Sequence, residues 1–359
     1  MKRREFLQFG IAASGLSGLL AFSHGCEQSG KPKQNLEFTK RYRGFNLLEK
    51  FTDTRNAPFQ ESDFEIMADW GFNFARIPMS YWCWSGPEDW YQMDETVLKE
   101  IDQVVEFGRQ YDIHVNLNLH RAPGYCVNPP GEPLDLWTND DAFDAAAFHW
   151  RHFAERYQGI SSEQVSFDLL NEPPNITESL YVPVIKRLVQ EIREVDPERI
   201  ILADGLRWGR EPVTGLTDLQ IGQSTRGYDP MRISHYRASW VSASKNWSEP
   251  TWPLVLGPDN VWDKQRLRED IIEPWVQLEQ QGTFVHVGEW GCYNKTPHRV
   301  ALAWMEDFLQ IWDVLKWGWA LWNLRGSFGV LDSGREDVDY EEFKGHKLDR
   351  KMLELIKRY

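Results

Sequence analysis

Short apolar runs alternate with amphipathic stretches along the chain from about residue 40 onward. Eight runs have the length and composition of buried strands: YRGFNLL (42–48), FNFARIPM (72–79), IHVNLNLH (113–120), VSFDLLNE (165–172), RIILADG (199–205), MRISHY (231–236), TFVHVGEW (283–290) and GWALWNL (318–324). Between most of them, apolar residues recur at helical spacing, in residues 94–110, 142–157, 178–194, 263–280 and 298–315. After the fifth run, only the short segment 212–220 is available for a helix.

Strands that alternate with helices predict parallel pairing. Eight such repeats in 359 residues predict a closed (β/α)8 TIM barrel, with chemically active groups at the carboxyl ends of the strands. The alternative is a doubly wound open sheet, which would carry a glycine-rich phosphate turn after its first strand, and GFNLLEKF has none. We expect residues 41–359 to form one domain, with long loops after the third strand (121–141) and the sixth (237–262).

The third predicted strand shows how its two faces divide. Successive strand residues point to opposite faces of a sheet. The apolar set can therefore pack beneath the helices while the polar set points into the barrel, which brings His120 to the rim. The apolar set is Val115, Leu117 and Leu119, and the polar set is His114, Asn116, Asn118 and His120.

Composition narrows the range of partners. The formal net charge of −14 argues against nucleic acid or an anionic membrane surface, because both need a basic protein face. The chain has 18 Trp, whose broad indole faces are typical of sugar-binding and base-stacking sites but also fill ordinary cores. We expect a monomer.

The amino-terminal sequence MKRREFLQFGIAASGLSGLLAFSHGC resembles an export signal. Arg3-Arg4 is of the twin-arginine type, and the apolar stretch that follows is too short for a stable membrane anchor. We therefore expect residues 1–25 to be an export signal and residues 26–40 a polar linker. A lipid on Cys26 is an alternative, so the product would be periplasmic, secreted or anchored at the cell envelope.

Export makes disulfides chemically allowed for Cys83, Cys126 and Cys292. Three is an odd number, so at most one pair can form. We expect a disulfide between Cys83 and Cys126, since both lie in what should be neighbouring loops. The cysteines lack the spacing of a metal site, and we expect neither a metal nor a cofactor.

Chemically useful side chains stand at the ends of six predicted strands. They are Arg76 on the second, His120 on the third, Asn171 and Glu172 on the fourth, His235 and Tyr236 on the sixth, Glu289 on the seventh and Trp322 on the eighth. Each alone has an ordinary structural explanation as a helix cap, an ion-pair partner or core filling. Their coincidence at one rim favours a single active site.

Two carboxyl groups facing each other across a barrel mouth suit glycosidic bond cleavage. One must be protonated to donate to the leaving oxygen, and the other must be ionised to attack the sugar or to activate water. Arg76 is the candidate for keeping Glu289 ionised, while less polar surroundings would raise the pKa of the other carboxyl group. Asn171 is placed to bond a sugar hydroxyl.

The motifs RGFN, ARIP, LNLH, NEP, GEWG and ALWNLRG occur in that order between residues about 40 and 330. With these motifs in this order, the chain resembles glycoside hydrolase family 5, the cellulase-like family of retaining barrel glycosidases. The resemblance implies a retaining β-glycoside hydrolase for a β-glucan or β-mannan type of polysaccharide or oligosaccharide. It implies Glu172 as acid/base, Glu289 as nucleophile and Trp322 as the platform beneath the sugar. It also implies that Arg76, His120 and Asn171 surround the sugar at the cleavage point.

The sixth strand departs from the family pattern. The family usually shows a His, one spacer residue and then Tyr there, whereas SHYRASW has His235 directly followed by Tyr236. Either the strand end is shifted, or the partner of the nucleophile is supplied by another residue. We assign both His235 and Tyr236 to the substrate-binding set.

Two rival classes of protein remain. A non-catalytic carbohydrate-binding barrel would be expected to lack one carboxylate, and both are present. A metal-dependent barrel hydrolase would need clustered imidazoles from His114, His120, His235 and His286. The first strand ends without a His-x-His pair, and His286 faces away from the Glu289 side on strand alternation. The sugar, the linkage, endo or exo action, and hydrolysis or transglycosylation stay open.

Overall fold

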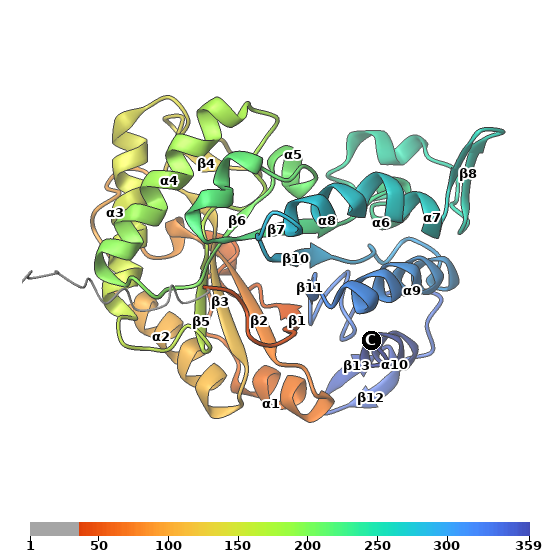
Figure 1. Ribbon diagram of the computed structural model, residues 1–359. Helices are drawn as coiled ribbons and strands as arrows, with labels where there is room; N and C mark the ends of the chain where they lie inside the picture. The colour runs from red at the N-terminus through yellow and green to blue at the C-terminus, as the bar shows by residue number, and fades with distance from the viewer. Residues whose placement is uncertain (1–35) are drawn as a thin grey trace, which may run out of the picture. The chain divides into compact units, whose positions relative to one another are not determined.

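The computed structural model describes residues 36–359, coloured in Figure 1, so the predicted export signal and most of the linker lie outside the described residues. Within this range eight parallel strands close into a barrel. They are β1 (Arg43–Asn46), β2 (Phe74–Ser80), β3 (His114–Ala122), β5 (Val165–Asp168), β6 (Ile201–Asp204), β7 (Gly222–Gly227), β10 (Val285–Trp290) and β11 (Gly318–Leu321). The pairing runs around the ring in chain order and returns through β11 to β1, which confirms the predicted (β/α)8 barrel.

Helices surround the barrel (Figure 1). They are α1 (Glu61–Trp70), α2 (Glu95–Gln110), α3 (Asp140–Arg156), α4 (Glu178–Val195), α7 (Lys264–Arg266), α8 (Glu273–Glu279), α9 (His298–Leu315) and α10 (Arg350–Lys357), with a π-helical turn at Leu267–Ile272 between α7 and α8. All five predicted helices are confirmed, whereas α1 and α10 were not predicted. The crossover after β6 contains only α5 (Leu206–Gly209) and a 3-10 helix (Thr214–Leu219), as its short sequence indicated. None of the helices in residues 36–359 is long and apolar enough to cross a membrane.

Local sequence signals set several helix ends. The Asp94 side chain accepts a hydrogen bond of 2.8 Å from the Thr96 N–H at the start of α2, and Asn139 caps α3 in the same way. Helix α1 ends at Gly71, whose φ of 84° lies in the left-handed region that glycine adopts at low cost. Gly71 is followed within a few residues by β2.

Smaller elements decorate the barrel. They are β4 (Tyr125–Cys126) paired antiparallel with β3, α6 (Met231–Ser234), the hairpin β8 (Leu254–Gly257) with β9 (Asn260–Trp262), the hairpin β12 (Glu341–Phe343) with β13 (His346–Leu348), and 3-10 helices at Asp53–Arg55, Tyr81–Cys83 and Ser242–Asn246. Elements β4, β8 and β9 belong to the long loops that were predicted after the third and sixth barrel strands.

The predicted sixth strand, residues 231–236, is wrong. That segment forms α6 and a following turn that holds His235 and Tyr236. The strand is instead β7, with the sequence GQSTRG, paired with β6 and β10. The strand was missed because it has no apolar run. Its side chains are mostly polar, and they are buried through hydrogen bonds. The Gln223 amide, for example, donates 2.8 Å to the Val213 carbonyl and accepts 2.8 Å from the Val213 N–H.

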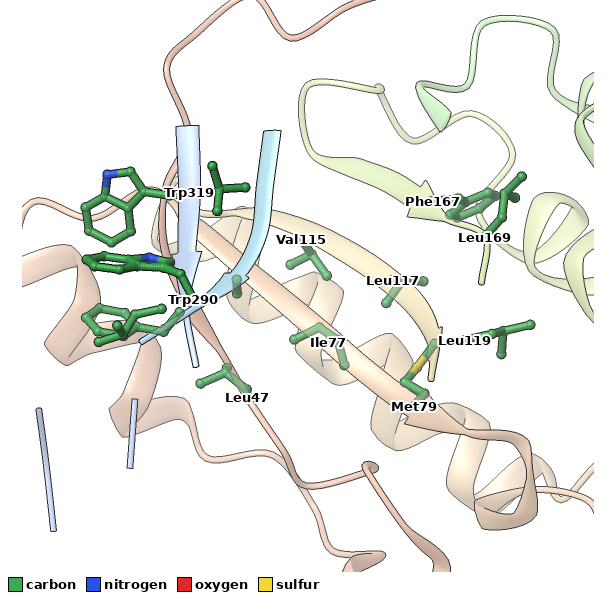
Figure 2. Packing of buried hydrophobic residues seen from close by; sticks show 14 of the residues in the cluster. Leu47, Ile77, Met79, Val115, Leu117, Leu119, Phe167, Leu169, Trp290 and Trp319 are labelled. Atoms are coloured by element: carbon green, nitrogen blue, oxygen red, sulfur yellow. The ribbon is translucent and has the colours of Figure 1, made fainter. Parts of the chain in front are cut away.

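The hydrophobic core lies between the barrel and its helices. Figure 2 shows Val115, Leu117 and Leu119 of β3 near Ile77 and Met79 of β2, all fully or almost fully buried. The polar residues of β3 point the other way. Asn116 donates 2.8 Å to the Ser166 hydroxyl, and Asn118 donates 3.1 Å to the Asp168 carbonyl, which confirms the predicted alternation.

Many of the tryptophans are core residues. Trp290 and Trp319 are fully buried, and their ring centroids lie 5.3 Å apart in an edge-to-face arrangement (Figure 2). Trp304 and Trp312 are buried on α9. For these four, the indole serves packing, so the tryptophan content by itself says little about sugar binding.

The expected Cys83–Cys126 disulfide is wrong. Cys83, Cys126 and Cys292 are all free thiols among the described residues. The Cys83 thiol points to the Lys50 carbonyl at 3.4 Å, whereas the Cys126 thiol points to the His120 carbonyl at 3.5 Å. Neighbouring loops do not suffice for a disulfide, because the two thiols must also face each other.

Candidate active site

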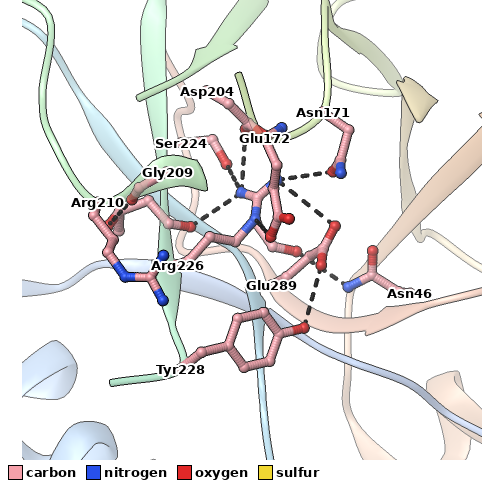
Figure 3. Close-up of polar contacts among 12 residues, drawn as sticks. Asn46, Asn171, Glu172, Asp204, Gly209, Arg210, Ser224, Arg226, Tyr228 and Glu289 are labelled. Carbon is pink, nitrogen blue, oxygen red and sulfur yellow. Dashed lines mark hydrogen bonds and ion pairs between the residues drawn. The ribbon is translucent and has the colours of Figure 1, made fainter. Parts of the chain in front are cut away.

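The carboxyl ends of the barrel strands bring together most of the predicted site residues. Arg76 comes from β2, His120 from β3 and Glu289 from β10. Asn171 and Glu172 follow β5, and Trp322 follows β11. Figure 3 shows the carboxylates of Glu172 and Glu289 close to one arginine, Arg226, which the sequence analysis did not include.

Glu289 is held from both of its carboxylate oxygens. Arg76 Nη1 donates 2.6 Å to Oε1, and the Tyr228 hydroxyl donates 3.2 Å to Oε2. Glu289 is 3% exposed, so these contacts are made largely out of solvent. A charge-assisted bond to a guanidinium favours the ionised form of a carboxyl group.

Arg76 is buried and bonded on every side. Besides Glu289, its guanidinium donates 2.8 Å to Asp168 Oδ2, 2.9 Å to Asn171 Oδ1 and 3.1 Å to Asn46 Oδ1. Burial raises the pKa of Asp168 to about 7, with a further contribution from the charge of Asp204 and opposition from Arg76. This network fixes the guanidinium beneath Glu289 and leaves it little freedom.

Glu172 has a constrained backbone. Its φ is 49°, in the left-handed region that non-glycine residues seldom adopt. Its N–H donates 2.7 Å to Asp204 Oδ2, and its carbonyl accepts 2.5 Å from the Tyr125 hydroxyl. Such a backbone persists only when its surroundings hold it, and at active sites it serves to aim a side chain.

The Glu172 side chain lies in different surroundings from that of Glu289. It is 18% exposed, and its Oε1 accepts a 3.2 Å hydrogen bond from Arg226 Nε. Burial raises the pKa of Glu172 to about 7, the charge of Glu289 adds to the rise, and Arg226 opposes it. A carboxyl group of this kind holds a proton at mildly acidic pH and gives it up near neutrality.

Unpartnered polar atoms face this pair of carboxyl groups. Asn171 Nδ2 and both ring nitrogens of His120 are buried with no hydrogen-bond partner within residues 36–359. The His120 ring lies 5.9 Å from the Trp322 ring and is nearly parallel to it. Burial, with Arg76 and Arg226 nearby, holds the pKa of His120 well below its usual range, so the ring is neutral. A neutral imidazole and an amide suit a ligand rich in hydroxyls.

The missed residues come mainly from β7 and the end of β6. Tyr228 and Arg226 belong to the sequence STRGYDP, and Asp204 ends the ILAD strand. The signal that could have found them is spacing, because Arg226-Gly227-Tyr228 repeats the one-residue gap of the family's His-x-Tyr pattern. Asn46 lies within the quoted RGFN motif but was not singled out.

Tyr236, which the sequence analysis assigned to the substrate-binding set, does not take the place of the family's Tyr beside the proposed nucleophile. Tyr236 is 3% exposed beneath the Arg237 guanidinium, and its hydroxyl makes no hydrogen bond to either carboxylate in the described part of the chain. Tyr228 makes that contact instead. His235 lies next to the site, with its ring 5.1 Å from that of Tyr228, and burial lowers its pKa to about 4.

The histidines required by a metal-dependent hydrolase do not come together. His114 and His286 lie at the amino-terminal end of the barrel, where each ring packs against Phe74. His120 and His235 lie at the opposite end. Residues 36–359 hold no cluster of three His, Cys, Asp or Glu side chains arranged for a metal ion.

Comparisons with known proteins agree with this geometry. Residues 37–327 match the family model described as Cellulase (glycosyl hydrolase family 5). The chain is 23% identical over 306 residues to Endoglucanase C of Acetivibrio thermocellus, covering 78% of this chain and 88% of that protein. It is 24% identical over 265 residues to Cellodextrinase A of Ruminococcus flavefaciens, covering 69% and 73%.

Among solved structures, one described as a glycoside hydrolase is 40% identical, with a TM-score of 0.85, and the match covers 89% of this chain and 99% of that one. The family model spans most of the chain, and it does so over the strands that carry both glutamates. The protein therefore belongs to glycosyl hydrolase family 5, the cellulase family, and is a β-glycoside hydrolase.

Proposed function

We propose that the protein is a retaining β-glycosidase that cleaves a β-linked glucan or its oligosaccharides. In this proposal Glu289 is the nucleophile and Glu172 is the acid/base. The observation that supports it best is the difference between the two carboxyl groups. Glu289 accepts hydrogen bonds from Arg76 and Tyr228, whereas the pKa of Glu172 is raised to about 7.

The first step forms a bond and breaks one. Glu289 Oε attacks the anomeric carbon as Glu172 gives its proton to the glycosidic oxygen, and the aglycone leaves as an alcohol. Arg76 and Tyr228 hold the Glu289 carboxylate in place for this attack. Asn171 Nδ2 and the ring of His120 donate to sugar hydroxyls, and Trp322 packs beneath the ring.

The second step releases the sugar. Glu172, now ionised, takes a proton from water as the water oxygen attacks the anomeric carbon and displaces Glu289. The anomeric configuration is retained because the carbon is inverted twice. The charge of Glu289, which adds to the raised pKa of Glu172 in the free enzyme, is lost to the ester, so this contribution disappears and Glu172 gives up its proton more readily.

The names of the relatives support a glucan as the substrate class. The two named relatives are an endoglucanase and a cellodextrinase, which indicates a β-glucan chain or a short glucan. Trp240 in the loop after β7 is 57% exposed and packs edge-on against Tyr293 and His235. It is a ready stacking surface for a further sugar unit.

The test is release of reducing ends from β-glucans, cello-oligosaccharides, β-mannans, xylan and aryl β-glycosides, comparing the wild type with Glu289→Gln. We expect activity on a glucan or cello-oligosaccharide that the substitution abolishes, with the β-anomer released first in NMR spectra. Activity on mannan alone would overturn the substrate, and first release of the α-anomer would overturn the retaining mechanism. Full activity in Glu289→Gln would overturn the assignment of the nucleophile.

We further propose that the protein is exported by the twin-arginine route, on the strength of Arg3-Arg4 and the apolar stretch after them. Arg3→Lys with Arg4→Lys should leave the protein in the cytoplasmic fraction of expressing cells. Unchanged export would contradict the route. Labelling with a fatty acid, lost in Cys26→Ser, would identify a lipid anchor.

A further inference from the structure

Arg226 is a buried arginine surrounded by carboxylates. Its side chain is 2% exposed, and it donates to Asp204 through two nitrogens, with Nη1 lying 3.1 Å from Oδ1. Its Nε donates 3.2 Å to Glu172, and its Nη2 lies 3.6 Å from Glu289 Oε1. Figure 3 shows this guanidinium beside both glutamates. One cation therefore touches both groups to which we assign the chemistry.

The neighbours of Arg226 leave it a single orientation. Nη2 donates 2.9 Å to Asn171 Oδ1, and Nη1 donates 2.9 Å to the Ser224 hydroxyl and 3.2 Å to the Thr225 carbonyl. Gly209 packs against its stem, where an added Cβ would stand 2.6 Å from Arg226 Cγ. Asp204 also accepts the Glu172 N–H, so one carboxylate fixes both the arginine and the backbone of the glutamate.

Arg226 stands where the family pattern has a histidine. The pattern is His, one spacer and Tyr, and here the sequence is Arg226-Gly227-Tyr228 at the same barrel strand. An imidazole gains and loses its charge near neutral pH, whereas a guanidinium keeps its charge at every working pH. The group beside Glu172 is thus a fixed cation in this protein, and its counter-ion Asp204 is fixed with it.

We propose that Arg226, anchored by Asp204, is a positioning residue that aims the Glu172 carboxyl group and favours its ionised form once Glu289 carries the sugar. The inference rests on the proposed function. In the free enzyme, Arg226 faces three anions at close range: Asp204, Glu289 and, when ionised, Glu172. In the glycosyl-enzyme, the Glu289 charge is gone, so the cation acts more strongly on Glu172 and supports its work as the base.

Arg226 and Asp204 act on Glu172 in opposite directions. The guanidinium attracts a carboxylate and favours loss of its proton, whereas the Asp204 charge opposes that loss. Removing one or the other should therefore shift the titration of Glu172 in opposite senses. A merely structural role predicts lower activity in both variants without this reversal.

Other groups also face this pair and are left unsubstituted in the comparison. One of them, Asp168, has a pKa that burial raises to about 7, so the Glu172 titration must be assigned by its own signal. The groups around Glu172 are Glu289 on β10, Arg210 after α5, Tyr125 and Cys126 on β4, and Tyr228 after β7. The groups around Arg226 are Arg76 on β2, His120 on β3 and Asp168 on β5. Burial raises the pKa of the Tyr125 and Tyr228 hydroxyls and of the Cys126 thiol, so these groups remain neutral near pH 7.

The experiment compares pH profiles of kcat/KM on an aryl β-cellobioside for the wild type, Arg226→Gln, Arg226→Lys and Asp204→Asn. The basic limb should move up by about 1 pH unit in Arg226→Gln and down in Asp204→Asn. Arg226→Lys should keep the wild-type limb because it keeps the charge. Arg226→Gln should also lower kcat more than kcat/KM, because an activated leaving group makes release of the sugar the slow step.

The matched control is Arg199→Gln, which removes another buried arginine paired with an aspartate, Asp196, at the far end of the barrel. It should lower Tm without moving the limb. Limbs that shift the same way in Arg226→Gln and Asp204→Asn, or do not shift, would overturn the inference. If Arg226→Gln fails to fold, the Arg226→Lys and Asp204→Asn profiles still decide it.

A second readout separates this inference from the proposed function. Carbon-13 NMR of labelled glutamate carboxyls, with Glu172→Gln for assignment, follows the titration of Glu172 without any substrate. Opposite shifts in the two variants would support the inference even if the substrate panel failed. An active wild-type enzyme with an unmoved Glu172 titration would overturn the inference and leave the proposed function standing.

Discussion

At the amino-terminal end of the barrel, His114 bonds through both ring nitrogens, at 2.9 Å to the Glu163 carbonyl and 2.6 Å to the Ser166 hydroxyl. Its ring stacks on Phe74 at 5.4 Å, and burial lowers its pKa to about 3. At the carboxyl end of the same strand, His120 is equally neutral, but neither of its nitrogens has a partner in the described residues. Two buried histidines on one strand thus differ in whether their hydrogen bonds are already made.

The same contrast holds for charge. The amino-terminal end packs aromatic rings and neutral imidazoles, including Phe38, which we had placed in the linker and which packs against Tyr42 and His286. The buried Arg199 at this end is paired with one aspartate, Asp196. The carboxyl end buries Arg76 and Arg226 among carboxylates. A fold that needed only stability would make both ends like the first, because buried charge is costly even when paired. The free-energy cost of burying charge is therefore greatest at the carboxyl end, where we propose the chemistry.

Among variants at the carboxyl end of the barrel, those of the two glutamates should lower activity the most. Glu289→Gln should lower kcat by about 10⁴-fold or more, because it removes the proposed nucleophile. Glu172→Gln should cost about 10²–10⁴-fold on natural glucans. The loss in kcat/KM should be far smaller on an aryl glycoside, because its leaving group needs no proton in the first step, whereas kcat should stay low because the second step lacks its base. Equal losses in kcat/KM on both substrates for Glu172→Gln would contradict its assignment as the acid.

A pair of tyrosines tests the corrected sixth strand. Tyr228→Phe removes the hydroxyl that donates to Glu289, and a buried bond to a charged group is worth about 1.5–3 kcal/mol, so kcat/KM should fall about 10- to 150-fold. Tyr236→Phe is the control and should stay close to wild type. A large loss in Tyr236→Phe with none in Tyr228→Phe would restore the assignment made from sequence.

The two histidines provide a smaller and more selective test. His114→Phe should lower the free energy of unfolding by about 1–3 kcal/mol, because it leaves two hydrogen-bond partners unsatisfied, while kcat/KM stays unchanged. His120→Phe should do the reverse and lower kcat/KM about tenfold with little change in urea unfolding. Both kcat/KM and urea unfolding should be measured for His114→Phe and for His120→Phe. Loss of activity without loss of stability in His114→Phe would contradict the division between the two ends.

The smallest effect is a stability difference in Glu172→Gln. The folded-state pKa of Glu172, about 7, lies above its unfolded value, so its protonation stabilises the fold fully below about pH 4 and this contribution is lost as pH rises toward 7. The variant lacks the buried charge, so its Tm relative to wild type should rise between pH 5 and pH 8. A constant difference across that range, measured by calorimetry, would contradict the raised pKa.

The sequence predicted the barrel because seven of its strands carry plain apolar runs. The eighth, β7, could not be found that way, since Gln223, Thr225 and Arg226 are polar residues buried by hydrogen bonds to Val213, Gly209 and Asp204, which lie outside the strand. For the same reason Arg226, Tyr228 and Asp204 were missed, while Arg76, Asn171, Glu172 and Glu289 were found in recognisable motifs. Asp204 looked like an ordinary strand end, and only the fold brings it to Glu172.

The most direct test of the account is to trap the covalent intermediate. A 2-deoxy-2-fluoro β-cellobioside with an activated leaving group should inactivate the enzyme and add the mass of one fluorinated cellobiosyl group. Peptide mapping should place that group on Glu289, within VHVGEW of β10. Attachment to Glu172, or turnover of a natural glucan by an enzyme that shows no adduct and releases the inverted anomer, would contradict it.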